Sequence, residues 1–266
     1  MYRGDEMRLI GKYFKMSLQR QLQYRLNFLI ACVSIGPIHL IQLVFSWFIA
    51  KEFDGFGTWD SWNLIFLYGL MLTSYGIAQV FARNLRYLED FVITGNLDIY
   101  FTKPQPILFG LVFHNLGVIE IFAHFFPSVA VLVAACICNR VHWSLYKLLV
   151  LLGAVIGGAF IQMALFLLIG SVSFWTMKSR SLEKIFYAFK DFLNYPLYVY
   201  GKEVLAFLTY VLPLAFINYY PSLYILDKEG SMDILNFMTI PVALLLSGIV
   251  LLIWKISLAH YNSAGN

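Results

Sequence analysis

The sequence predicts an all-α membrane protein that crosses the bilayer several times, and three observations lead to this prediction. Hydrophobic residues make up 60% of the 266 residues, whereas charged residues make up only 13%. A soluble domain carries roughly 25% charged residues, and most of its surface must face water. Apolar stretches of about 20 residues, the length that spans a bilayer, also recur along the chain. The net charge of +4 is too small to indicate a nucleic-acid partner.

Residues 1–26 are predicted to contain an amphipathic helix that lies in the membrane interface. Apolar residues recur at spacings of four, and basic and amide residues fall on the opposite side. A basic amphipathic helix followed at once by an apolar span favours the interface, and the alternative is a simple cytoplasmic helix. The apolar residues are Ile10, Phe14, Leu18 and Leu22, and the polar ones are Lys12, Lys15, Gln19 and Gln23.

Residues 27–266 are predicted to form one transmembrane domain with six spans. Five candidates are long and apolar: Asn27–Ala50, Trp62–Ala82, Ile107–Cys138, Lys147–Trp175 and Ile234–Leu258. The remaining span lies in one of two places. One is the aromatic-rich run Ile185–Tyr200, and the other is Val204–Leu226, which Pro213 and Pro221 interrupt.

Lysine and arginine set the predicted orientation. They are concentrated in the N-terminal segment, in the polar stretch 83–106 and after the fourth span. Cytoplasmic loops carry an excess of these residues, so both termini are expected in the cytoplasm. The loops on the opposite side, around residues 51–61 and 226–233, are rich in acidic residues instead.

Sequence motifs of enzymes are missing from the chain. It contains no GxxxxGK[ST] phosphate loop, no HExxH and no GxSxG. The three cysteines lie in apolar runs and indicate no disulfide framework and no metal site. We therefore expect no catalytic residues and no cofactor bound by this chain.

Ionisable residues at membrane depth are the candidates for an intramembrane site, because burying them is costly. Glu120 and His124 are four apart and share a helical face. They are either a polar point in a conduit or, the reading we favour, a hydrogen bond between helices that fixes packing. Lys190 and Asp191 are adjacent, about 100° apart on a helix, and need partners elsewhere.

The stretch Arg83–Pro106 is the longest polar interlude between the apolar segments. Leu85, Leu88 and Val92 recur at helical spacing, and Gly95 with Asn96 then breaks the helix. The charged residues Arg86, Glu89 and Asp90 flank the apolar ones. Such a short amphipathic helix either lies on lipid or fits a groove in a partner protein.

Two motifs in the chain resemble those of a known family. ITGNLDIYFTKPQP is similar to the "I-x-x-G-x-L-D-x-x-L-x-x-P" stretch of exporter-class (type 2) ATP-binding-cassette permeases. Within that family, the stretch resembles specifically a branch whose permeases occur as paired, non-identical subunits. Downstream, Tyr195-Pro196-Leu197 followed by LTYVLPLAFINYYPSLYIL resembles that branch's "YPL…LTFVLPFAFVNYYPA" segment.

The resemblance implies a heteromeric exporter in the bacterial cytoplasmic membrane. It implies two copies of an ATPase subunit that carries ATP and Mg, and a second, non-identical six-span permease. It also implies a cytoplasmic coupling helix between spans two and three, and a re-entrant helical hairpin near residues 202–222 on the outer side. The implied coupling residues are Arg83, Arg86, Leu88, Glu89, Asp90, Gly95 and Asp98. The implied residues of the outer gate are Pro196, Leu197, Pro213, Asn218 and Pro221, with the fifth span near Leu182–Tyr198.

Three rival hypotheses remain open from the sequence. A membrane enzyme would use Glu120 and His124, but it needs more converging groups than one pair. An ion-coupled transporter could use the same pair, and its usual signature is broken helices in paired positions. The last is an anchor for an ATPase complex that transports nothing itself.

Overall fold

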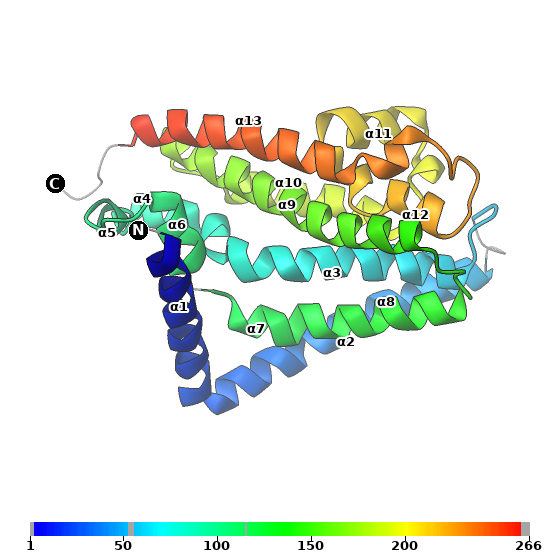
Figure 1. The fold of residues 1–266 in the computed structure, drawn as a ribbon, viewed down its shortest axis with the longest axis horizontal. Coiled ribbons are helices and arrows are strands. Elements are labelled where there is room, and N and C mark those ends of the chain that lie inside the picture. Colours follow the sequence, from blue (N-terminus) through cyan, green and yellow to red (C-terminus); the bar gives the residue numbers. More distant parts are fainter. Residues whose placement is uncertain (1–2, 53–55, 115, 262–266) are drawn as a thin grey trace.

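The computed structural model of the protein describes residues 3–52, 56–114 and 116–261, with side chains from residue 8 onward. Every regular element in these ranges is a helix, so the predicted all-α fold is confirmed. The longer helices lie roughly parallel, along the long axis of the molecule (Figure 1). We call the end of the bundle where α3 (Ser61–Arg86) begins the Asp60 end, and the opposite end the Arg86 end.

The N-terminal helix α1 (Arg3–Gln23) points away from the long axis of the bundle (Figure 1). It meets α2 (Arg25–Glu52) at Tyr24. Phe14 and Leu22, on the apolar side of α1, are exposed at 40% and 49%. The rest of the chain therefore leaves this apolar side largely uncovered, which suits a helix that lies on lipid.

Within the described residues, five helices are long and apolar enough to cross a membrane. They match five of the six predicted spans, and α3 is the central and most buried of them. The last span begins later than predicted, because residues Ile234–Phe237 form a separate 3-10 turn, η6. The five helices are α2, α3 continued by α4 (Leu88–Ile93), the segment Val118–Cys138, α9 (Leu145–Thr176) and α13 (Thr239–Ala259).

The third predicted span is shorter than expected and is not one regular helix. α6 (Ile107–Phe113) is separate from α7 (Val118–Glu120), because the Gly117 N–H donates to the Val80 carbonyl of α3 at 2.9 Å and turns the chain. After α7 comes a π-helical turn, η1 (Ile121–Phe125), and then α8 (Phe126–Cys138). Pro127 has no N–H to donate to the carbonyl four residues back, so the helix widens at this point.

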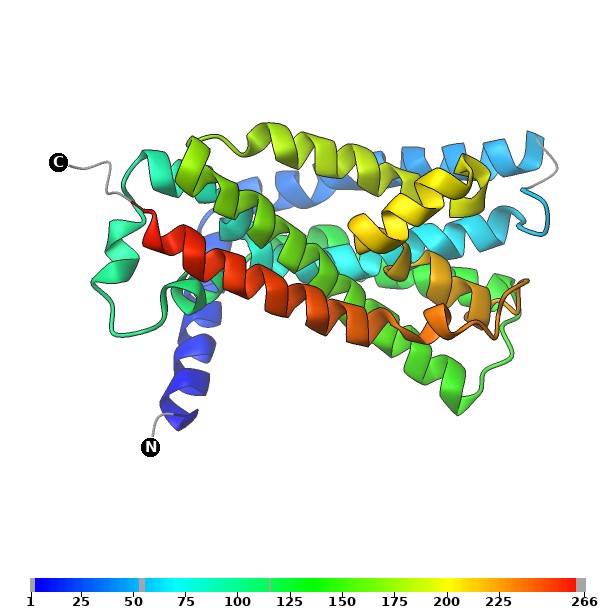
Figure 2. The same ribbon diagram turned by 90° about the horizontal axis from the view of Figure 1, so that it is seen from above.

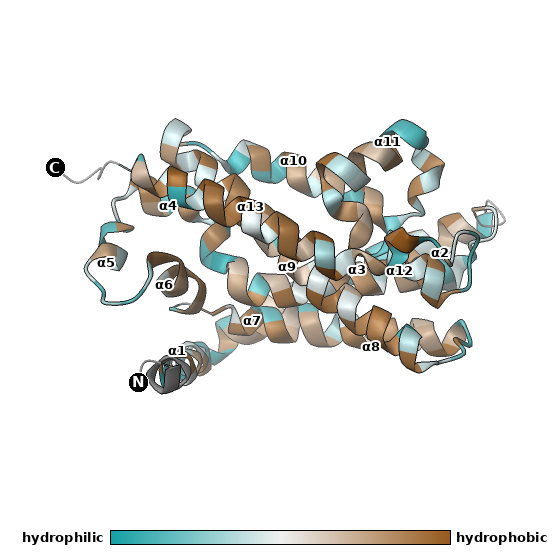
Figure 3. Cartoon of the chain, turned by 45° about the horizontal axis from the view of Figure 1, so that its top comes forward, coloured by the Kyte–Doolittle hydropathy of each residue, from teal (hydrophilic) through white to brown (hydrophobic). Residues whose placement is uncertain are grey.

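Apolar side chains cover the outward faces of several spans. Figure 3 shows brown, hydrophobic residues along α8 and α13, whereas α10 and α11 carry teal, hydrophilic patches. Such faces are unusual on a soluble protein and match contact with lipid. Exposed examples are Val33 and Ile41 on α2, Val133 and Ile137 on α8, and Leu244 and Leu252 on α13.

The segment after α9 runs from one end of the bundle to the other. α10 (Arg180–Asp191) begins at the Arg86 end, where Arg180 contacts Asp90. Two 3-10 turns, η2 (Phe192–Asn194) and η3 (Leu197–Tyr200), continue it. The Tyr198 hydroxyl then donates to the Phe56 carbonyl at the Asp60 end. Figure 2 shows this segment, in yellow-green, running along the length of the view.

A bent pair of helical segments follows, with an angle of 79° between its arms. The first arm is α11 (Lys202–Ala206) with η4 (Phe207–Val211), and the second is η5 (Pro213–Phe216) with α12 (Tyr219–Ile225). The pair starts next to Tyr200, near the Asp60 end. It also finishes there, because the Asp227 carboxylate accepts from the Lys147 ammonium, at the start of α9, at 2.6 Å.

Candidate functional site

The predicted coupling region forms the corner of the bundle at the Arg86 end. α3 ends at Arg86, α4 follows, and Gly95 adopts a φ of 72°, in the left-handed region that glycine tolerates. The helix break predicted at Gly95 and Asn96 is therefore present. α5 (Asp98–Phe101) completes the corner, and the Asp98 carboxylate accepts from the Tyr261 hydroxyl at 3.0 Å.

The apolar side of α4 faces the core. Leu88 and Val92 are buried, together with Leu85 at the end of α3. Gly170 of α9 lies opposite, so close that a Cβ there would stand 3.1 Å from the Leu88 Cβ. Leu88 therefore packs against α9, whereas the predicted charged side is also partly covered, because Glu89 is buried.

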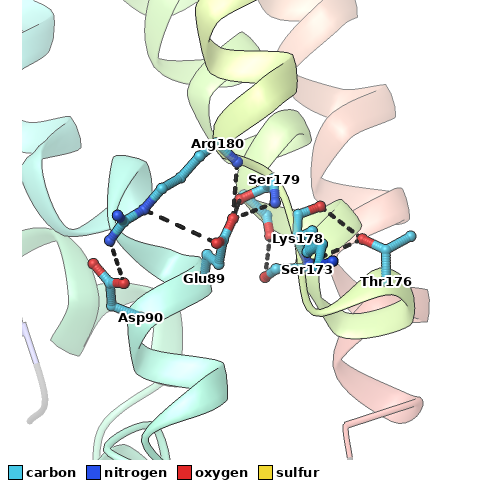
Figure 4. Close-up of polar contacts among 8 residues, drawn as sticks. Glu89, Asp90, Ser173, Thr176, Lys178, Ser179 and Arg180 are labelled. Carbon is cyan, nitrogen blue, oxygen red and sulfur yellow. Dashed lines mark hydrogen bonds and ion pairs between the residues drawn. The ribbon is translucent and has the colours of Figure 1, made fainter.

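Glu89 connects α4 to the loop between α9 and α10 (Figure 4). Its carboxylate accepts from the backbone N–H of Ser179, from the Ser179 hydroxyl at 3.2 Å and from the backbone N–H of Arg180 at 2.8 Å. Glu89 and Ser179 are both buried. A buried carboxylate with several donors is a strong link, because each charge-assisted bond is stronger than a neutral one.

Two ion pairs reinforce this link: in one the arginine belongs to α10, and in the other it belongs to α3. The Arg180 guanidinium donates to the Asp90 carboxylate at 2.5 Å, and the Arg86 guanidinium donates to Glu183 at 2.8 Å. Arg86 also donates to the Gln79 side chain at 2.7 Å. We call the whole group the α4–α10 clamp; it consists of Arg86, Glu89 and Asp90 on one side and Ser179, Arg180 and Glu183 on the other.

The clamp changes which residues of the corner are available to a partner. Arg86 and Glu89 are engaged within the chain, and half-exposed Asp90 holds Arg180. Arg83 is half-buried and belongs to α3 rather than to the corner's outer face. The large apolar side chains Tyr87, Ile93, Ile99 and Phe101 are exposed there, and so are the polar residues Thr94, Asn96 and Thr102.

A second group of polar residues lies inside the bundle, between α2, α3, η1 and α10. Glu120 and His124 approach to 3.3 Å. His124 is 3.0 Å from His39 of α2, and His39 is 2.8 Å from the Tyr68 hydroxyl of α3. Sequence reasoning missed His39 and Tyr68, although a histidine in the middle of an apolar span was a signal for His39.

Lys190 extends this group from α10. Its ammonium lies 4.1 Å from the ring centre of Tyr75 and 5.5 Å from that of Tyr187, and the two tyrosine hydroxyls are 3.2 Å apart. A cation over aromatic rings is stabilised by their electron-rich faces. Lys190 and Asp191 do point to different surroundings, as predicted, because Asp191 is exposed.

The residues predicted for an outer gate lie in and around η3 and the bent pair. Pro196 precedes η3, where Leu197 is fully buried. Pro213 follows the bend, and Pro221 lies in the first turn of α12. Asn218 links the bent pair to two neighbours, because its amide donates to the Leu67 carbonyl at 3.0 Å and to the Leu193 carbonyl at 2.7 Å.

Comparison with known proteins identifies the family. The family model described as "ABC-2 family transporter protein" matches residues 37–265, which is nearly the whole chain. No curated protein and no solved structure matches the chain. Members of the matched family are membrane components of transporters, which agrees with the apolar helices of the bundle. The chain therefore belongs to the ABC-2 family of transporter membrane proteins.

Proposed function

We propose that this chain is the permease subunit of an ATP-binding-cassette exporter, and that it forms the substrate conduit together with a second, non-identical six-span permease. Two copies of a separate ATPase subunit supply the energy and carry the ATP and Mg. Family membership supports the transport role, and the chain has no phosphate loop of its own.

The corner formed by α4 and α5 is the proposed docking site for the ATPase. Tyr87, Ile93, Ile99 and Phe101 are exposed there by 45–54%. Exposed apolar side chains beside charged residues are typical of a protein interface. Of the carboxylates that the sequence suggested as contacts, Glu89 and Asp90 are held in the clamp and Asp98 accepts from Tyr261. The exposed apolar residues are therefore the better candidates.

The α4–α10 clamp is the proposed route from docking to the spans, and the bonds from Glu89 to the start of α10 are the observation that carries this proposal. A partner that pushes the corner also displaces α10, because the two elements are joined by buried hydrogen bonds. The polar group around Lys190 lies on the same helix. Closure of the ATPase subunits would thus reach the interior of the bundle through one element.

The proposed topology has both termini and the Arg86 end in the cytoplasm of a bacterium, with α1 in the membrane interface. α10 with η2 and η3 is the fifth span. The bent pair, near residues 202–222, is a re-entrant hairpin on the outer side. Two features support this choice of the fifth span. α10 with η2 and η3 connects the two ends of the bundle, whereas the bent pair begins and finishes at the Asp60 end. In this topology the chain has two parts, the interfacial helix of residues 1–26 and one membrane domain of residues 27–266.

Co-purification tests the proposal. The full chain is isolated in mild detergent from its host, and everything that accompanies it is identified. We expect an ATPase with a GxxxxGK[ST] motif and a second six-span protein. A chain that comes down alone and still moves or modifies a compound would overturn the proposal.

One observation favours a second candidate, an ion-coupled transporter. Glu120 of α7, His124 of η1, His39 of α2 and Tyr68 of α3 form a continuous chain of close polar contacts. This is more than the single pair visible in the sequence, and chains of this kind occur in proton relays. Transport into vesicles that contain the Glu120→Gln variant distinguishes the ion-coupled transporter from the ATP-driven exporter. Loss of the dependence of transport on a proton gradient supports ion coupling. Unchanged ATP-driven transport supports a packing role for Glu120.

A further inference from the structure

A basic pocket lies at the Arg86 end, between α1 and the corner of the bundle. Its volume is about 260 Å³. Three of its lining residues can carry positive charge, and none of the described residues that line it is acidic. The lining residues are Arg20, Asn84, Phe91, Asn96, Ile99, Tyr100, Lys103 and His114.

The basic residues come from three separate parts of the chain and meet around Tyr100. The Lys103 ammonium lies 4.8 Å from the centre of the Tyr100 ring, and the edge-on ring of His114 lies 5.9 Å from the same ring. Arg20 reaches the pocket from α1. Tyr13, seven residues earlier on the same face of α1, contacts His114 with ring centres 5.4 Å apart.

Two positive charges of the pocket act on His114. Burial lowers the pKa of His114, and the positive charges of Lys103 and Arg20 lower it further. Tyr13 of α1 and Tyr100 of α5 are the other titratable groups that face His114. An anion in the pocket would relieve this repulsion between like charges, and it would favour the protonated, donating form of His114.

Hydrogen-bond donors complete the fit to an oxyanion. Lysine and arginine donate to phosphate oxygens by charge-assisted bonds, and the exposed Asn96 amide sits at the pocket wall. Arg20 of α1 lines the pocket, and the uncovered apolar side of α1 would set this region at the level of lipid head groups.

We propose that this pocket binds an anionic phosphate group through Arg20, Lys103 and His114. The phosphate belongs either to the head group of an anionic phospholipid or to a free phosphate ion. In both cases it ties α1 to the corner that contains Asn96 and Tyr100, two parts of the chain that meet at this pocket.

Native mass spectrometry of the full-length protein in detergent tests the site. Phosphatidylglycerol and phosphatidylcholine compete for the chain, and inorganic phosphate is titrated by calorimetry in a separate arm. Arg20→Gln with Lys103→Gln should reduce binding of the anionic ligand by about tenfold or more, because the charge-assisted hydrogen bonds from these two side chains to the phosphate are lost. Lys12→Gln with Lys15→Gln removes the same charge from α1 outside the pocket, and should leave binding unchanged.

The outcomes separate the two sources. Selective retention of phosphatidylglycerol without phosphate binding identifies a lipid head group, and saturable binding of inorganic phosphate identifies a free ion. Arg20→Lys with Lys103→Arg keeps the charges and should retain binding, which controls for folding of the glutamine variant. Equal binding by the wild type, the pocket variant and the Lys12/Lys15 control would overturn the proposal.

Discussion

The carboxylate of Glu89 on α4 accepts hydrogen bonds from both the backbone N–H and the hydroxyl of Ser179, which begins the turn into α10. Both residues are buried, at 9% and 2% exposure. The corner of the bundle and α10 therefore share a buried contact, although their sequences lie far apart. Because of this contact, a displacement of the corner is expected to displace α10 as well.

Glu89→Ala should destabilise the protein much more than Asp90→Ala. Without the Glu89 carboxylate, the donors of Ser179 and Arg180 lose their acceptor in a buried place, which costs about 1–3 kcal/mol for each unsatisfied group. The Asp90–Arg180 pair is largely exposed, and such pairs contribute about 0–1 kcal/mol. Thermal denaturation of the two variants in detergent measures the difference.

A matched variant keeps the Glu89 test specific. Glu89→Gln retains one acceptor oxygen and nearly the same volume, so its thermal midpoint should lie between those of the wild type and Glu89→Ala. Equal midpoints for Glu89→Ala and Asp90→Ala would contradict the buried clamp.

Ile99→Arg should abolish co-purification of the ATPase without changing the stability of the chain. Ile99 is exposed by 54%, so the new charge meets water in the free chain, but it would be buried in an interface with the ATPase. The measurement is the amount of ATPase recovered with each variant from the same membranes.

Two controls accompany this prediction. Ile99→Leu keeps an apolar surface and should retain the ATPase, and Met232→Arg places the same charge on an exposed residue at the Asp60 end. Full recovery of the ATPase with Ile99→Arg would move the docking site away from α5.

Lys202→Cys should react with an impermeant thiol reagent added outside the cell. Lys202 begins the bent pair, which follows the end of η3 and is proposed to lie on the outer side. The background lacks the three native cysteines, Cys32, Cys136 and Cys138. Lys103→Cys, at the Arg86 end, should react only after the membrane is opened. Protection of Lys202→Cys in intact cells would favour Val204–Leu226 as the fifth span.

Much of this fold follows from local patterns in the sequence. Runs of apolar residues predicted the spans, and Gly95 with Asn96 predicted the break after α4. The spacing of four between Glu120 and His124 predicted a shared helical face, and their side chains lie 3.3 Å apart. Each of these features depends on residues close together in the chain, so periodicity and composition are sufficient to find it.

The features that the sequence did not predict depend on tertiary contacts. The end of α6 is set by the bond from Gly117 to Val80, and Pro127 widens the helix into η1. The amphipathic pattern around Glu89 predicted a docking surface, but periodicity could not show that α9 and the turn at Ser179 already occupy most of that helix. The exposed apolar residues on α5 became visible only from the fold.

Gly76→Leu should destabilise the bundle, whereas Gly248→Ala should be nearly neutral. A Cβ at Gly76 would lie 2.9 Å from the Phe125 Cα, so a larger side chain would push α3 away from η1. Overpacking of this kind costs about 1–3 kcal/mol. A Cβ at Gly248 on α13 meets nothing within 4 Å. Thermal midpoints in detergent compare the two, and similar values would contradict the close packing of α3 against η1.

Cross-linking at Ile99 tests the central claim, that the α4–α5 corner is the ATPase docking site, most directly. Ile99→Cys in the cysteine-free chain is treated in native membranes with a short thiol-to-amine cross-linker, alongside Met232→Cys at the opposite end. We predict that Ile99→Cys forms an adduct with an ATPase that carries a phosphate loop, and that Met232→Cys does not. An Ile99→Cys chain that forms no such adduct, while the ATPase still co-purifies with it, would contradict docking at this corner.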